Sequence, residues 1–531
     1  MKSRLLFVIG GICSLLIAQQ PNLVINPRVL QAHVEFLSDD LFEGRGTGER
    51  GGDLTVRYLE TQSALLGLKP FNGMSYRQSV KIAGLKTSPT SRISFEGSTF
   101  WSPKFGDEIV YGTGTTEKEI IFNAPLIFVG YGITAPEEKW DDYKGLDYQG
   151  KVVVMMVNDP QPTKAEPNRF GGEALTYYGR WRYKFEEAKR QGALGVLLIH
   201  TAPSASYGWN VVENSWLKER SQLATGKGGT DLQGWISNET AEKLFAMSGL
   251  NLDQERAKAE RRSFRPVLLS SKIKGSLISD IRQFEQFNVG GLVIGTDPEL
   301  SKEVIIYSAH WDHLGKNDDL IKLGKDGIYN GAIDNATGIA SLFAMAETAK
   351  AYPAKRTQMF LWVCAEEQGL LGSAHYAENP LWPIDKTVAN LNLDSTNYLG
   401  LTRDIGTRGS ERSGLGVLAE QVAKSMNMVI TTPQPDLAGF YFRSDHFSFA
   451  KVGIPAFSIE AGQDFLEPDA AKKRSLQVNY NNKVYHQVTD ELQPYFSWTG
   501  MVQEAEFALR LGWVIGQVPR ISLMKPPTGG K

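Results

Sequence analysis

The second half of this 531-residue chain alternates short apolar segments with longer amphipathic ones, and this alternation constrains the fold more than any other feature. The short segments have the length of buried strands, and the longer ones have apolar residues at helical spacing. Strand, helix and strand in succession favour crossovers onto a largely parallel sheet, so we expect an α/β architecture. The strands are expected at 288–294, 304–309, 357–364, 388–394, 428–432 and 454–459, and the helices at 335–351, 370–378, 414–425 and 496–512.

The first half of the chain divides into three parts. The first residues have the pattern of a secretory signal: basic Lys2 and Arg4, an apolar run at 5–17 and the small residue Ala18. The apolar run is too short for a membrane anchor, which needs ~20 apolar residues. Strand-like runs at 126–130, 151–157 and 195–200 and a helical pattern at 183–190 then form a block of their own. We predict a signal at 1–18, the first part of the main domain at 19–116, a small β-rich insert at 117–270, the rest of the main domain at 271–517 and a flexible tail at 518–531.

Charge and cysteine content exclude several classes of protein. The 57 basic and 59 acidic residues give a net charge of −2, so neither nucleic acid nor an anionic membrane is an implied partner. No second long apolar segment follows the signal, so we expect an exported, periplasmic or extracellular protein without integral membrane association after signal removal. Cys364 is the one cysteine outside the predicted signal, and an internal disulfide is therefore excluded.

Side chains of the types that bind metal ions follow several of the predicted strands. Parallel strands bring their carboxyl ends to one edge of a sheet, where ligands bind. A group of carboxylates at such an edge is hard to explain as packing, because unpaired buried carboxylates are costly. The residues concerned lie in His310–His313, Gly331–Gly338, Glu366–Glu367, at Asp394 and in Val484–Asp490.

These runs resemble the five motifs of the M28 peptidases, which are co-catalytic zinc aminopeptidases and their relatives. The motifs occur in the family's order at Ser308–His313, Gly331–Gly338, Glu366–Glu367, Asn392–Asp394 and Tyr485–His486. The segment 37–48 resembles the start of the family, and the insert resembles a protease-associated (PA) domain at Val129–Ile133 and Gly150–Val154. The resemblance implies a three-layer peptidase domain with a central mixed, largely parallel sheet and an inserted PA domain.

The resemblance also implies two zinc ions per chain. His310 would bind one and His486 the other, Asp334 would bridge them, Glu367 would join one site and Asp394 the other. Two imidazoles and three carboxylates suit Zn²⁺, although manganese or cobalt could occupy the same ligands. Two metal ions ~3.5–4 Å apart lower the pKa of a shared water and hold both the attacking and the carbonyl oxygen.

Further roles follow from the same resemblance. Glu366 would be the general base, Tyr485 would donate a hydrogen bond to the oxyanion, and Asp312 would orient the His310 imidazole. Arg443 lies in a segment near the substrate pocket of the family; a structural role is open for both Tyr485 and Arg443. His313 is expected to be a neighbour of the site rather than a ligand, and Cys364 a small core residue.

The function that we expect is an exported aminopeptidase that removes N-terminal residues from peptide substrates. A carboxypeptidase or dipeptidase would use the same metals, and a glutaminyl cyclase is a weaker alternative because it works with one zinc ion. A binding protein of the receptor type that has lost its metals is the alternative from another class. The sequence leaves the oligomeric state open.

Overall fold

The computed structural model describes residues 20–224, 228–431 and 434–520, which form two compact units. The first unit contains 20–80, 285–431, 434 and 441–520, and the second contains 81–224, 228–284 and 435–440. The predicted signal at 1–18 and residues 521–531 of the predicted tail lie outside the described residues. Residues 518–520 of that predicted tail are described, and among them Val518 is buried.

The first unit is built on a mixed sheet whose central strands are parallel. Strand β14 (Val304–His310) lies between β15 (Thr357–Val363) and β16 (Thr387–Leu393), and β19 (Ala456–Glu460) follows β16. All residues of β14, β15 and β16 are buried. The sheet continues on both sides. Beyond β15 lie β13 (Val267–Val293) and β1 (Lys69–Pro70), each antiparallel to its neighbour. Beyond β19 lie β17 (Asp404–Arg408), which is antiparallel to β19, and β18 (Val429–Ile430), which is parallel to β17.

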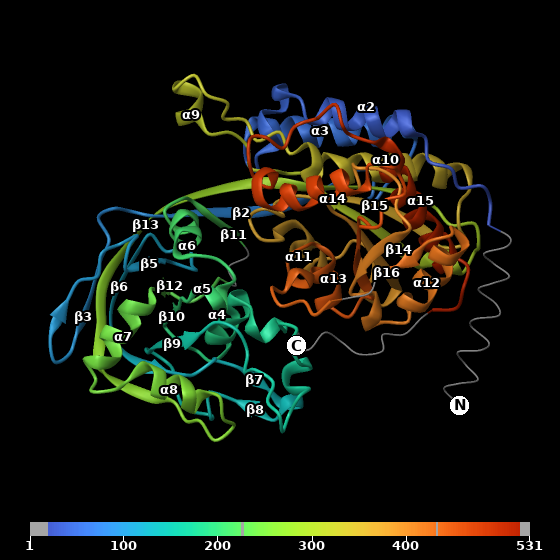
Figure 1. Cartoon of the computed structure of the whole chain (residues 1–531). Coiled ribbons are helices and arrows are strands. Elements are labelled where there is room, and N and C mark those ends of the chain that lie inside the picture. The colour runs from blue at the N-terminus through green and yellow to red at the C-terminus, as the bar shows by residue number, and fades with distance from the viewer. Residues whose placement is uncertain (1–19, 225–227, 432–433, 521–531) are drawn as a thin grey trace. The chain divides into compact units, whose positions relative to one another are not determined.

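Helices cover both faces of this sheet, as Figure 1 shows. Helix α10 (Thr337–Ala351) packs on β14 and β15 and contacts α2 (Pro27–Leu37) and α15 (Trp498–Ile515). On the other face α13 (His446–Lys451) packs on β16 and β19 and against α11 (Leu371–Glu378). The predicted α/β fold with a mixed, largely parallel sheet is therefore confirmed. Further helices of this unit are α3 (Arg50–Leu66), α12 (Leu415–Ser425) and α14 (Ala470–Asn479).

The second unit has a sheet and a core of its own. Its parallel strands are β6 (Glu119–Phe128), β9 (Val152–Met156), β10 (Gly195–Ile199) and β12 (Leu232–Ile236). Helix α4 (Trp181–Arg190) packs on β10, and the predicted strands and helix of the insert are confirmed within a few residues. Strands from the segment before residue 117 also pair here: β3 (Arg92–Glu96) with β13 and with β4 (Phe100–Trp101), and β5 (Ile109–Gly112) with β12.

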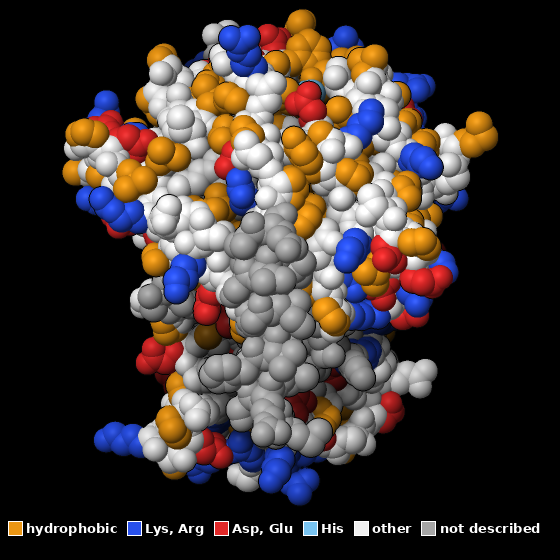
Figure 2. Space-filling model, turned by 90° about the vertical axis from the view of Figure 1, so that its right-hand side faces the viewer, with side chains coloured by type: hydrophobic (Ala, Val, Ile, Leu, Met, Phe, Trp, Pro, Cys, Tyr) orange, Lys and Arg blue, Asp and Glu red, His pale blue; other side chains and the backbone are white. Residues whose placement is uncertain are grey.

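The described part of the face shown in Figure 2 carries side chains of all types. Hydrophobic side chains of the described residues are interspersed there with charged and uncharged polar ones. Single exposed apolar residues are normal for proteins in water. Among the residues that the structure describes, no helix combines the length and the apolar content needed to span a bilayer.

Gly338 lets helix α10 begin directly against the end of β16. A Cβ atom at this position would lie 2.7 Å from the carbonyl oxygen of Leu393, which is closer than such contacts occur. The Asn335 side chain joins the two elements, because its Nδ2 donates to the Leu393 carbonyl at 3.1 Å and its Oδ1 accepts from the Gly338 amide at 3.0 Å. This close approach brings Asp334, just before the helix, beside Asp394, just after the strand.

Gly338→Ala is expected to lower the free energy of unfolding by about 1–3 kcal/mol, the usual effect of forcing an extra methyl group into a packed site. Denaturant unfolding measures the change. Ser341→Ala, in the same helix, is the matched control, because it removes only a hydroxyl that donates to the Thr337 carbonyl. An alanine variant at 338 as stable as the wild type would contradict this account of the packing.

Candidate metal centre

The structure brings all five predicted metal ligands together at the carboxyl ends of the central strands. His310 is the last residue of β14, Glu367 follows β15, and Asp394 follows β16. Asp334 lies in the turn Ala332–Ala336 that precedes α10, and His486 follows the turn Tyr480–Val484 far downstream. Four separate loops therefore meet at one edge of the sheet, together with the end of β14.

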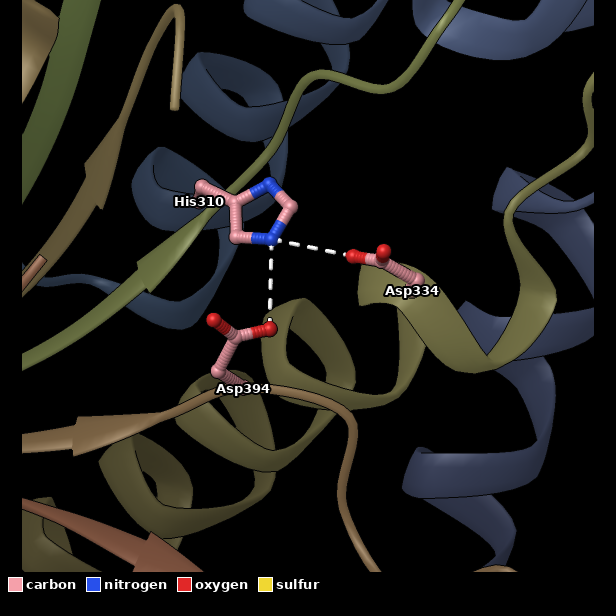
Figure 3. A group of neighbouring side chains, drawn as sticks. All are labelled: His310, Asp334 and Asp394. Carbon is pink, nitrogen blue, oxygen red and sulfur yellow. Dashed lines mark hydrogen bonds and ion pairs between the residues drawn. The ribbon is translucent and has the colours of Figure 1, made fainter. Parts of the chain in front are cut away.

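The first group of ligand atoms surrounds the His310 imidazole. Its Nε2 lies 3.1 Å from Asp334 Oδ1 and 3.3 Å from Asp394 Oδ1, and Figure 3 shows it directed toward both carboxylates. The other ring nitrogen, Nδ1, lies 3.0 Å from the carbonyl oxygen of Asp312. Because a carbonyl only accepts, Nδ1 carries the proton and Nε2 is left with a lone pair for a cation.

The second group is centred on Glu367. His486 Nε2 lies 3.0 Å from Glu367 Oε2 and 3.3 Å from Asp334 Oδ2. Asp334 thus presents one oxygen to each group. The structure also brings in His313, whose Nδ1 lies 2.7 Å from Glu367 Oε1 and 4.0 Å from Asp334 Oδ2.

These separations fit two zinc ions. Zinc–nitrogen and zinc–oxygen distances of roughly 2.0–2.2 Å at tetrahedral angles put neighbouring ligand atoms about 3.3–3.5 Å apart. The four contacts of His310 and His486 have separations of 3.0–3.3 Å. Asp334 Oδ1 and His486 Nε2 are buried atoms without a hydrogen-bond partner among the described residues, as expected for atoms that face a cation.

The charges of the site favour cations strongly. Burial opposes the charged imidazole of His486, but Glu367 and Asp334 raise its pKa to about 11. Burial likewise opposes protonation of His310, whose pKa is nevertheless raised well above its usual range by Asp394 and Asp334. The carboxylate of Glu367 is buried and lies near Asp334, yet the neighbouring His486 and His313 hold its pKa at about 2. The carboxylates therefore draw positive charge to the site, as protons or as metal ions.

Asp490 holds the backbone around Asp334, the shared carboxylate, in place. Its Oδ1 accepts from the Ile333 amide at 2.9 Å and its Oδ2 from the Asp334 amide at 3.1 Å, and its side chain is fully buried. No role was predicted for Asp490 from the sequence. The one signal was its position at the end of the Val484–Asp490 motif, four residues after His486.

Arg45 connects the N-terminal segment to two ligand-bearing loops. Its guanidinium is fully buried, and burial lowers its pKa to about 10, although Asp490 and Asp334 oppose this decrease. A guanidinium remains charged at this value, so it is a permanent cation beside the carboxylates. It donates to the carbonyl oxygens of Leu37 (2.8 Å), Trp311 (3.0 Å), Asn330 (2.5 Å) and Gly331 (2.8 Å).

The predicted catalytic side chains surround the ligands. Burial raises the pKa of Glu366 well above its usual range; His310 opposes this increase, and Glu367 adds to it. Asp312 is fully buried, and its two carboxylate oxygens accept from the amides of Glu366 at 3.1 Å and Glu367 at 3.4 Å. Asp312 therefore orients His310 through its backbone carbonyl and the Glu366–Glu367 turn through its side chain.

Tyr485 directly precedes the proposed ligand His486, and Arg443 directly precedes a residue that contacts the proposed ligand Asp394. The Tyr485 ring stacks on the His486 ring with centroids 3.8 Å apart, and 46% of the Tyr485 residue is exposed. Arg443 directly precedes Ser444, whose hydroxyl donates to Asp394 Oδ2 at 2.7 Å. Tyr485 is therefore not fully buried, as an aromatic residue with a purely structural role in packing would be.

Comparison with known proteins extends these observations. The chain is 27% identical over 241 residues to leucine aminopeptidase 1 of Arthroderma otae and 30% identical over 191 residues to leucine aminopeptidase 1 of Trichophyton rubrum. These matches cover 43% and 33% of this chain and 58% and 49% of those proteins, so the chain spans about half the length of the curated relatives it matches. An aminopeptidase from Aneurinibacillus sp. strain AM-1 has a similar fold, with a TM-score of 0.52 and 17% identity over 95% of this chain and 96% of that one.

The fold and the paired histidine–carboxylate groups together define an α/β protein with a candidate metal centre of the metallopeptidase type. The family follows from the sequence of the same region. Residues 288–511, which contain both groups, match the model of peptidase family M28, and this part of the chain belongs to that family.

Zinc is expected to stabilise the first unit, because a ligand that binds only the folded state adds about 4 kcal/mol at a concentration 1,000-fold above its Kd. Thermal unfolding of protein stripped with a chelator, with and without added zinc, measures the shift. Asp334→Ala removes the shared ligand and is expected to abolish most of the shift, whereas Asp464→Asn, at the surface beside Arg403, leaves it unchanged. A wild-type melting temperature that does not respond to zinc would contradict the assignment of the site.

Proposed function

We propose that this chain is an exported zinc aminopeptidase that binds two zinc ions and hydrolyses the first peptide bond of its substrates. One observation carries the proposal: Asp334 presents its two oxygens to two separate histidine–carboxylate groups, at 3.1 Å from His310 and 3.3 Å from His486. A single carboxylate shared in this way can hold two metal ions close together, as two-metal catalysis needs. The names of the sequence relatives favour an amino-terminal specificity with an apolar first residue, such as leucine.

Each ion would be held by one histidine, by one carboxylate of its own (Asp394 or Glu367) and by the shared Asp334. Bound zinc ions would polarise the scissile carbonyl and make a water molecule a strong nucleophile at neutral pH. Glu366 is the proposed general base, because it directly precedes the ligand Glu367 and its backbone amide is fixed by Asp312. It would accept the proton of the attacking water and deliver it to the leaving amine.

The exposed side of the site would receive the peptide. Tyr485 is half exposed and stacked on the ligand His486, so its hydroxyl is the proposed hydrogen-bond donor to the tetrahedral oxyanion. Arg443, beside the Ser444 that contacts Asp394, is the proposed substrate-orienting residue.

The second unit is the proposed PA-like domain. It has parallel strands and a buried core that includes Val153, Met155, Val196 and Trp235, and we propose for it a role in substrate access. The residues that suggest export, Lys2, Arg4 and Ala18, lie outside the described part of the chain, so export rests on the sequence pattern.

A panel of substrates tests the proposed function. Leucyl and other aminoacyl anilides should be cleaved, peptides with a blocked N-terminus should not, and elemental analysis should find about two zinc ions per chain. Cleavage of N-blocked peptides from the C-terminus would support a carboxypeptidase instead. Absence of both zinc and hydrolysis would overturn the proposal in favour of a binding protein.

Glu366→Gln is expected to lower kcat by about 10²–10⁴-fold, the usual contribution of a general base. Zinc content should stay at the wild-type level, because this substitution leaves all five proposed ligands in place. Glu420→Gln, an exposed position in α12, is the control and should have wild-type activity. Wild-type turnover in the Glu366→Gln variant would assign the base to another residue.

A further inference from the structure

Asp394 and Glu367 are the two proposed carboxylate ligands that each belong to one group only. In both of them one oxygen accepts a hydrogen bond from a residue outside the predicted ligand set. Asp394 faces His310 with Oδ1, while its Oδ2 accepts from the Ser444 hydroxyl at 2.7 Å. Glu367 faces His486 with Oε2, while its Oε1 accepts from His313 Nδ1 at 2.7 Å. We propose that Ser444 and His313 are positioning residues that hold Asp394 and Glu367 as one-oxygen ligands and so keep a coordination position of each cation open. The proposal rests on the proposed function.

The direction of the Ser444 hydrogen bond is fixed by chemistry. An ionised carboxylate only accepts, so Ser444 donates its single proton to Asp394. Its oxygen is then free to accept, and Asn392 Nδ2 donates to it at 2.8 Å. Asn392 Oδ1 in turn accepts from Ser308 Oγ at 2.7 Å, and Ser308 Oγ accepts from Asn390 Nδ2 at 2.9 Å.

This row of hydrogen bonds lies inside the sheet. Ser308 belongs to β14, Asn390 and Asn392 belong to β16, and all three side chains are buried. A buried donor or acceptor that loses its partner costs about 1–3 kcal/mol, so each member has one favourable orientation. The last member, Ser444, is thereby held with its proton directed at Asp394 Oδ2.

His313 is placed as a hydrogen-bond donor to Glu367, although His313, Asp334 and Glu367 also lie close enough together to form a candidate metal-binding group. Its Nδ1 is 2.7 Å from Glu367 Oε1, a hydrogen-bond distance, and 4.0 Å from Asp334 Oδ2. Two ligand atoms on one tetrahedral zinc ion lie about 3.3–3.5 Å apart, and neither distance matches. His486 meets that criterion better with the same two carboxylates, at 3.0 and 3.3 Å. The side chain of His313 is fully buried, which keeps it in this position.

Removal of either donor should change the coordination of one cation. When the outer oxygen is released, the carboxylate can bind through both oxygens and fill the position that water or substrate needs. The two donors act on different carboxylates, because Asp394 belongs to the His310 group and Glu367 to the His486 group. Each substitution should therefore affect one of the two cations and leave the other unchanged.

The experiment uses the full chain with zinc and with cobalt. Ser444→Ala and His313→Ala are each expected to raise the Kd of one zinc ion about 10–100-fold, the usual effect of losing a partner of a metal ligand. In the cobalt protein, the visible absorption of that one ion should weaken, because Co²⁺ with an additional ligand absorbs less than tetrahedral Co²⁺. Ser444→Thr and His313→Asn retain a donor and should restore both properties, and Ser341→Ala is the buried control outside the row.

Unchanged cobalt spectra and zinc affinity in both alanine variants would overturn this inference. It is overturned equally if threonine and asparagine fail to restore what alanine removes, since the donated hydrogen bond is then not the cause. Failure of the proposed function looks different, because the wild-type chain itself would then bind no zinc pair and cleave no aminoacyl anilide.

Discussion

The rest of this structure depends on one constraint, a group of closely spaced carboxylates at one edge of a parallel sheet. Asp334, Glu367 and Asp394 contact two imidazoles, and Asp312 and Asp490 lie directly behind them. Charges of one sign cannot be buried together without compensation. The protein supplies one permanent cation, Arg45, and strongly basic histidines; divalent ions would supply the remainder.

The ligand positions are determined as much by backbone hydrogen bonds as by the ligands themselves. Asp490 binds the amides at 333 and 334, Asp312 binds those at 366 and 367, and Arg45 binds carbonyls of the two loops that carry His310 and Asp334. Asp490, Asp312 and Arg45 are all buried, so buried hydrogen bonds hold the backbone of these loops in place. Such preorganisation is what a site needs if it is to hold two ions at a fixed separation.

The central strands, and the meeting of the five proposed ligands at one edge of the sheet, could be predicted from the sequence because both leave local signals. The segment 304–309 is a largely apolar run, and His310, Asp334 and His486 occur in motifs of known order. Arg45 and Asp490 left no comparable signal, because most of their partners are main-chain groups more than 150 residues away in sequence.

Other features were missed for related reasons. Only the C-terminal end of β13 was predicted, as a strand at 288–294; the polar alternation of the preceding residues hides the rest of this 27-residue strand from a search for apolar runs. His313 was predicted to be a neighbour of the site, yet its contact with Glu367 depends on how the loop after β14 folds back, and no spacing rule describes that.

The hydrogen bonds of Arg45 also have a consequence for the biosynthesis of the protein. The site needs residue 45, the strands between 304 and 393, and the loop that ends at Asp490, so no part of the chain shorter than this span contains a complete centre. A ribosome-bound intermediate that has exposed only the first four hundred residues lacks His486. The complete group of candidate ligands would therefore come together late, after nearly all of the polypeptide has been translated.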